Sequence, residues 1–211
     1  MGFTTFATFV LIGAAQVASP GPSTVFLLNN AIMYGPRRAI LVLSGDLVAI
    51  VILASLSAAG VGALLATNVT LFTALRLGGA VYPLWLGLRY FRAPSVVVED
   101  GDGDGMPAGQ DGGSLGLWLQ SFGIGISNPK AILFFAALFP QFVPADGGPG
   151  LLAVLVGTFV ATKLFVLAGF AFGARQLRSL FSGQDNGALG RRLTGALFIM
   201  FGLGMIWPIL A

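Results

Sequence analysis

The sequence predicts an all-α membrane protein with six transmembrane helices arranged as two inverted repeats of three helices. Hydrophobic residues make up 56% of the 211 positions and charged residues only 9%, whereas soluble domains carry about 25% charged residues. Two helix-breaking motifs, SPGP at 19–22 and SNPK at 127–130, interrupt long apolar segments. We therefore expect a single transmembrane domain over 1–211, with repeat one at 1–92, an acidic linker at 93–114 and repeat two at 115–211.

The composition also excludes several function classes. The chain has no histidine and no cysteine, so it lacks thiol nucleophiles, Ser-His pairs and the usual zinc and haem ligands. Its nine Arg and two Lys occur in a few short clusters, a pattern unlike the basic face of a nucleic-acid binder. We expect a protein that lies in the lipid bilayer, is not an enzyme, and uses no cofactor, metal or nucleic acid.

The sequence contains six apolar segments. Each is close to or longer than the length of about 20 residues that a helix needs to cross the bilayer. They run from Phe3 to Tyr34, Ala39 to Leu65, Val69 to Phe91, Leu115 to Phe142, Leu151 to Phe172 and Leu189 to Leu210. The first and fourth contain the proline motifs, and proline ends a helix because it lacks a donor and clashes with the preceding turn. In lipid the freed backbone groups need polar partners. The two breaks therefore predict a polar site inside the bilayer.

An internal repeat relates the two halves of the chain. RLGGA at 76–80 opens the third segment, RLTGA at 192–196 opens the sixth, and the breaks occupy matching places in the first and fourth. Because three spans is an odd number, the second copy must insert upside down, which is the plan of many secondary transporters. The alternative is a chance match in a chain with 31 glycines.

Arginine clusters predict the orientation. One side of the predicted bundle carries Arg37, Arg38, Arg89, Arg92, Arg175, Arg178, Arg191 and Arg192, while the opposite loops at 67–70 and 144–150 have no Lys or Arg. The positive-inside rule places the arginine-rich side in the cytoplasm and, with six spans, both termini outside. If one broken segment is re-entrant, the N-terminus lies inside instead.

The acidic linker contains five of the eight acidic residues: Glu99, Asp100, Asp102, Asp104 and Asp111. Their spacing meets most of the calcium-loop pattern, but Asp111 stands where that loop has a bidentate Glu. We interpret the segment as a disordered acidic linker rather than a metal site.

Charged side chains within spans are costly and are functional candidates by default. Asp46 lies in the second segment and Lys163 in the fifth, and the offset between Arg76 and Arg192 maps position 46 onto position 162. We expect the two charges to pair across the pseudo-two-fold axis, and Asp46, the only carboxylate within a span, to take up and release a proton. The alternative is a purely structural ion pair.

Lys130 follows Pro129 in the first turn of a new half-helix, where free backbone donors and the helix dipole favour an anion. We expect a substrate carboxylate there and at the donors after Pro22, with polar side chains satisfying an amino group. The predicted substrate-binding set is Gln16, Ser19, Pro20, Gly21, Pro22, Asn29, Ser127, Asn128, Pro129 and Lys130, with Asn30, Gln120 and Gln141 as further candidates. The alternative is that Lys130 snorkels to the membrane interface.

Several blocks resemble the LysE/RhtB family of amino-acid exporters. AQVASPGP at 15–22, YGPRRA at 34–39 and SGD at 44–46 are similar to its N-terminal signature; its later blocks resemble LGGAVY at 77–82, LGLR at 86–89, SNPKAILFF at 127–135 and FPQF at 139–142. The resemblance implies a multi-pass exporter of the bacterial inner membrane, driven by the proton motive force, for amino acids such as homoserine, threonine, lysine or arginine. Ser23 and Pro83 depart from the family's usual Asn and Leu.

The favoured function is therefore a secondary-active, proton-coupled amino-acid exporter with alternating access around the two breaks. Its partners would be a small-molecule substrate, protons, the lipid bilayer and, in one arrangement, a second copy of the chain. A passive channel or ion carrier on the same inverted-repeat plan is the alternative. A membrane-embedded enzyme is disfavoured because one Asp and two Lys in the spans do not form a catalytic set.

Overall fold

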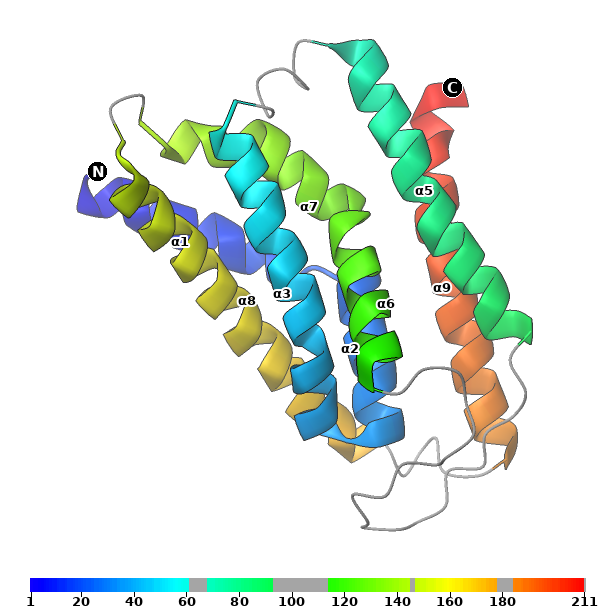
Figure 1. Cartoon of the computed structure of the whole chain (residues 1–211). Helices are drawn as coiled ribbons and strands as arrows, with labels where there is room; N and C mark the ends of the chain where they lie inside the picture. Colours follow the sequence, from blue (N-terminus) through cyan, green and yellow to red (C-terminus); the bar gives the residue numbers. More distant parts are fainter. Residues whose placement is uncertain (61–67, 93–113, 145–146, 178–183, 211) are drawn as a thin grey trace.

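The computed structural model describes residues 1–60, 68–92, 114–144, 147–177 and 184–210, and all the secondary structure in these ranges is helical. The acidic residues of the predicted linker lie outside the described residues. The elements, shown in Figure 1, are α1 Phe3–Ala18, α2 Pro22–Tyr34, α3 Pro36–Ala58, α5 Val69–Arg92, α6 Ser114–Ile126, α7 Pro129–Leu133, the π-helical η1 Phe134–Leu138, the 3₁₀-helical η2 Phe139–Phe142, α8 Pro149–Leu177 and α9 Gln184–Leu210.

Both proline motifs separate two helices, as the sequence predicts. The chain bends by 59° between α1 and α2, and by 44° between α6 and the segment that begins at Pro129. Pro22 and Pro129 each stand in the first turn of the new helix, where the missing N–H has no intrahelical partner to lose. Local proline chemistry thus explains why the two breaks fall at these positions.

Within the described ranges, four segments have the length and apolar character of a membrane span. They are α3 with a mean hydropathy of 2.5, residues Pro149–Ala174 of α8 with 2.3, and the two bent pairs if each counts as one span. The predicted third and sixth spans fold as α5 with 24 residues and α9 with 27. The full count of six spans remains a prediction.

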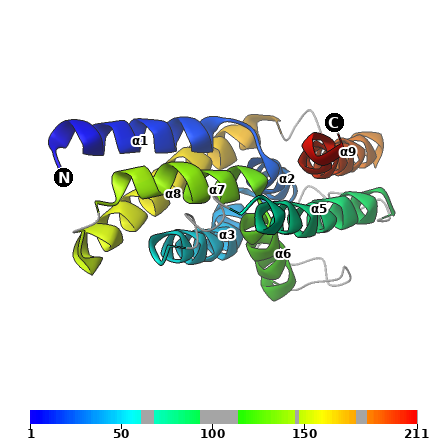
Figure 2. The same ribbon diagram turned by 90° about the horizontal axis from the view of Figure 1, so that it is seen from above.

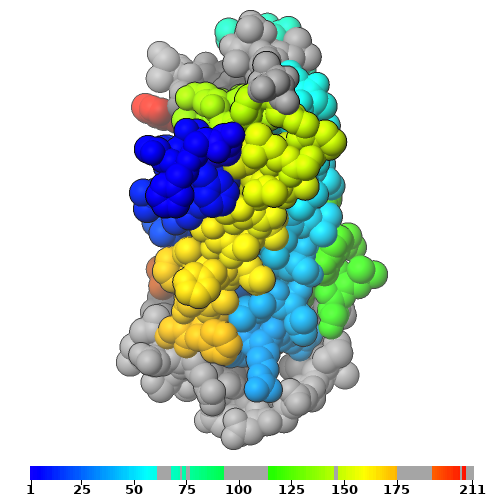
Figure 3. All heavy atoms as spheres, turned by 90° about the vertical axis from the view of Figure 1, so that its left-hand side faces the viewer, coloured from blue at the N-terminus to red at the C-terminus, as the bar shows by residue number. Residues whose placement is uncertain are grey.

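The helices pack as a bundle with one long pair at its edge. α5 and α9 lie side by side along their lengths, while α2 contacts α3, α8 and α9 (Figures 1 and 2). α3 packs against both α6 and α8, and Figure 3 shows α8 between α1 and α3 on one face of the molecule. This packing brings the two breaks towards each other around α3.

An aromatic cluster forms much of the core between α1, α8 and the segment after Pro129. Ring centroids are 4.9 Å apart for Phe134 and Phe159 and 6.1 Å apart for Phe9 and Phe139, and all four side chains are buried. The outer surface is also apolar, with exposed side chains at Phe3, Leu11, Leu41, Phe165 and Trp207. A surface of this kind suits contact with lipid rather than water.

The helix that begins at Pro129 is irregular because of a second proline, Pro140. Its missing N–H cannot bond a carbonyl of the preceding turns, and the chain widens into η1 and then tightens into η2. The carbonyl of Phe135, whose π-helical partner would be the nitrogen of Pro140, instead accepts a hydrogen bond from Ser57 Oγ of α3. This contact fixes the irregular segment to the end of α3.

Candidate functional site

Four polar side chains connect the two helix breaks with α3 and α8. Lys163 Nζ of α8 forms an ion pair with Asp46 Oδ2 of α3. Ser23 Oγ of α2 donates a hydrogen bond to Asp46 Oδ1 at 2.7 Å, and Asn128 Nδ2 donates one to Ser23 Oγ at 3.0 Å. All four residues are buried. We call Lys163, Asp46, Ser23 and Asn128 the buried polar chain.

The starts of the two half-helices position this chain. Asn128 is the N-cap of α7, and its Oδ1 accepts a hydrogen bond from the Lys130 N–H at 3.1 Å. That cap satisfies one of the donors that every helix leaves free at its start and turns the Asn128 amide NH₂ towards Ser23. Ser23 follows Pro22 in the first turn of α2. Each break therefore contributes a polar residue from its helix start.

The ion pair between Asp46 and Lys163 is deeply enclosed, with exposed fractions of 1% and 5% for the two residues. Removing two charges from water is costly and is offset only by close pairing and added hydrogen bonds, which Ser23 supplies. On the other side, α6 approaches closely at Gly125, where a Cβ would lie 2.7 Å from Asp46 Oδ1 and 2.9 Å from Ala49 Cβ. Gly125 thus lets α6 cover the carboxylate. The predicted pairing of Asp46 with Lys163 is observed; its role in coupling stays a prediction.

The Lys130 ammonium binds oxygen atoms of the protein itself. Its Nζ donates hydrogen bonds to the Gln16 carbonyl at 2.5 Å, the Ser19 carbonyl at 2.6 Å and Ser19 Oγ at 3.1 Å. These oxygens lie at the C-terminal end of α1, where the helix dipole favours a cation. The Lys130 side chain also crosses Gly21, with Cε 3.4 Å from the position of a Cβ there. The two breaks are therefore joined by this contact as well.

The structure does not bring all the predicted site residues together. Asn29 lies on another face of α2: its Nδ2 donates to the Tyr90 hydroxyl and its Oδ1 accepts from Thr194 Oγ1, both at 3.4 Å. It therefore joins α2 to α5 and α9 instead of the buried polar chain. Gln16 contributes its backbone carbonyl to Lys130 rather than its side-chain amide.

The remaining predicted residues flank the breaks or lie elsewhere. Pro20 is exposed, Pro22 is buried, and Ser127 and Pro129 are half-buried beside Asn128. The further candidates form local contacts: Asn30 Nδ2 donates to the Phe26 carbonyl, the Gln120 carbonyl accepts from Tyr82, and Gln141 Nε2 donates to the Ala137 carbonyl.

The predicted substrate-binding set omits Ser23, although its hydroxyl stands at the centre of the buried polar chain, between Asp46 and Asn128. The signal in the sequence is its place: it is the polar residue directly after Pro22, in the first turn of a half-helix. Such residues point towards whatever satisfies the helix start. Thr194 and Tyr90, which hold Asn29, are also absent from the predicted set.

Broken helices that meet at buried charges within an apolar helical bundle define the class of membrane transporters. The comparison with known families agrees, since the model of the LysE type translocator matches residues 14–207. The chain belongs to the LysE family, and its members are translocators rather than enzymes.

Relatives cover almost the whole chain. It is 32% identical to a leucine efflux protein of Enterobacter sp. (strain 638), over 95% of this chain and 94% of the relative. It is 27% identical to a homoserine/homoserine lactone efflux protein of Salmonella typhimurium, over 96% of each chain. A leucine efflux protein of Klebsiella pneumoniae is 28% identical, over 95% of this chain and 93% of the relative. No solved structure matches the chain.

Proposed function

We propose that this chain is a secondary-active exporter of amino acids or close derivatives in the bacterial inner membrane. The buried polar chain that links both helix breaks carries this proposal, because it joins a titratable carboxylate to the starts of both half-helices. Leucine, homoserine and homoserine lactone, which the names of the relatives give as exported compounds, share a primary amino group. We propose a substrate that carries the same group.

Alternating access is supported by the order and packing of the helices. Each half has a bent pair followed by two long helices, and the equivalent helices contact each other, α3 with α8 and α5 with α9. Contact between equivalent elements is expected of two inverted repeats around a pseudo-two-fold axis. We propose that six spans form these repeats and that the halves rock around the buried polar chain.

Coupling to protons is assigned to Asp46. Protonation would remove its charge and so weaken its attraction to Lys163, which α8 holds against it in this structure. If α3 and α8 separate during the cycle, Asp46 can load a proton in one access state and release it in the other. The substrate would bind between the breaks, next to Ser19, Gly21 and Lys130.

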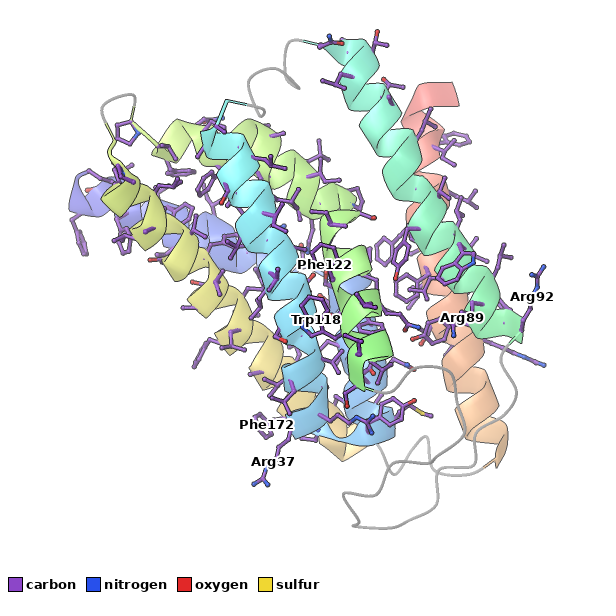
Figure 4. All side chains as sticks on the ribbon, viewed as in Figure 1. Arg37, Arg89, Arg92, Trp118, Phe122 and Phe172 are labelled. Atoms are coloured by element: carbon purple, nitrogen blue, oxygen red, sulfur yellow. The ribbon has the colours of Figure 1, made fainter. Side chains whose placement is uncertain are left out.

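The arginines support a cytoplasmic assignment for one end of the bundle. Arg37 and Arg92 lie towards the same end in Figure 4, where α3 begins and α5 ends. The last turn of α9 lies towards the opposite end (Figure 1). With the positive-inside rule, this arrangement supports termini on the outside.

The experiment that tests this function uses purified protein in liposomes. We expect counterflow of labelled leucine or homoserine in the wild type, and accumulation of substrate against its gradient when a proton gradient is imposed. Asp46→Asn should keep counterflow and lose accumulation, while Ser44→Ala, two residues away on the exposed side of α3, should keep both. Absence of counterflow for every amino acid tested would contradict the substrate class. Accumulation by Asp46→Asn at the wild-type rate would make the ion pair structural.

A further inference from the structure

We propose that the C-terminal end of α1 is a binding site for the primary ammonium group of the substrate, and that Lys130 occupies this site in the structure described here. The inference rests on the proposed function and names the chemistry of its binding step. We define the ammonium site by three oxygens: the Gln16 carbonyl, the Ser19 carbonyl and Ser19 Oγ.

The geometry of the site matches an ammonium group. The three oxygens lie 2.5, 2.6 and 3.1 Å from Lys130 Nζ, and a primary ammonium has three N–H donors and no acceptor. Two of the oxygens are backbone carbonyls at the end of α1, where the dipole adds negative potential. Ser19 Oγ is held in place by its own hydrogen bond to the Gln16 carbonyl at 2.9 Å. A cation bound there thus has every donor satisfied.

The ammonium site is more exposed than the ion pair between Lys163 and Asp46. Ser19 and its neighbours Ala18 and Pro20 are exposed, and Lys130 is only half-buried, whereas Lys163 and Asp46 are buried. In the proposal, this uncovered side of Ser19 is the route by which a small ammonium compound reaches the end of α1 without opening the ion pair. Lys163 already holds the carboxylate of Asp46, so Asp46 is not free to bind a substrate amine in this state.

Displacement of Lys130 would connect substrate binding to both breaks. The Lys130 N–H is part of the Asn128 cap, and Asn128 donates to Ser23 of the first break. A substrate ammonium that takes the three oxygens releases the Lys130 ammonium beside Gly21, where it can pair with the carboxylate of an amino-acid substrate. Lys130 thus acts as an internal competitor that holds the two breaks together until substrate arrives.

The test measures binding of a simple ammonium ion to a protein whose internal competitor has been removed. In Lys130→Met, ethylammonium chloride at about ten times its Kd should raise the unfolding temperature by about 3–6 °C. Wild-type protein should show little change, because Lys130 fills the site. Tetramethylammonium chloride at equal concentration is the matched control, since it has the same charge and no N–H donor.

A second variant covers the case in which Lys130→Met does not fold. Because the chain has no cysteine, Lys130→Cys can be alkylated selectively, either with 2-bromoethylamine to rebuild a lysine-like ammonium or with iodoacetamide to leave a neutral group. The neutral form should respond to ethylammonium and the rebuilt form should not. Equal responses of the two forms, or of ethylammonium and tetramethylammonium, would overturn the proposal. Counterflow by wild-type protein is scored separately, so failure of the ammonium site and failure of the export function give different results.

Discussion

At the scale of single residues, Asp46 is the point where most of the site converges. Its carboxylate pairs with the Lys163 ammonium of α8 and accepts a hydrogen bond from the Ser23 hydroxyl of α2, and α6 packs closely against it at Gly125. A carboxylate in such surroundings has lost its water, and its stability depends on the partners that replace water. Both its energetics and its proposed function should therefore respond to changes in Lys163 and Gly125.

The ion pair predicts a strongly non-additive double-mutant cycle. Asp46→Asn leaves the Lys163 ammonium buried without its partner. Lys163→Met likewise leaves the Asp46 carboxylate buried without its partner. Each single change should lower the free energy of unfolding by about 3–5 kcal/mol, whereas the double variant should lose far less than the sum. Unfolding in mild detergent measures this cycle. Additive losses would show that the two charges do not interact in the folded protein.

Gly125 predicts a steric effect on the same carboxylate. Gly125→Ala would place a Cβ within 3 Å of Asp46 Oδ1 and Ala49 Cβ, so α6 must shift, at a cost of about 1–3 kcal/mol. Gly157→Ala on α8 is the control, because the structure shows nothing within 4 Å of its Cβ position. There, alanine should be neutral or stabilising by up to about 1 kcal/mol. Similar thermal unfolding of both variants would contradict the close packing of α6 on α3.

At the scale of elements, proline chemistry made the breaks predictable from the sequence. Pro22 and Pro129 act on their own turns, so the ends of α1 and α6 follow from local rules. The partners of Lys130 could not be predicted in this way, because the Gln16 carbonyl, 114 residues earlier in the chain, is brought to its Nζ only by tertiary packing. The contacts of Asn29 with Tyr90 and Thr194 could not be predicted for the same reason, because they depend on the packing of α5 and α9 against α2.

Two asparagine caps in the part of the chain that the structure describes predict that stability and function can be separated. Asn128 caps α7 and also contacts Ser23, whereas Asn68 accepts a hydrogen bond from the Leu71 N–H at 2.9 Å at the exposed start of α5. Replacement of either residue by alanine should cost about 0.5–2 kcal/mol of stability. Only Asn128→Ala should also lower the counterflow rate, because it separates the two breaks. Equal transport by both variants would make Asn128 a structural cap alone.

At the scale of the whole molecule, the two halves share an element order but differ in detail. α2 continues as a regular helix to Tyr34, whereas its counterpart becomes irregular at η1 and η2 before Phe142. The offset of the proposed repeat predicted that Asp46 and Lys163 lie close to each other, and the structure pairs them between α3 and α8. Periodicity and motif spacing thus predicted the helices and the ion pair, while the contacts between distant faces required the tertiary structure.

The orientation of the bundle is testable because the chain has no native cysteine. Ser114 begins α6, and Thr70 lies in the first turn of α5 towards the other end of the bundle (Figure 1); both are exposed. The proposed orientation puts the end of the bundle that carries Arg37 and Arg92 in the cytoplasm, so Ser114→Cys should resist an impermeant thiol reagent in intact spheroplasts and react after permeabilisation. Thr70→Cys should react at once, and the Cys-free wild type provides the background. The reverse pattern would place the arginines outside and invert the direction in which the proposed proton cycle runs.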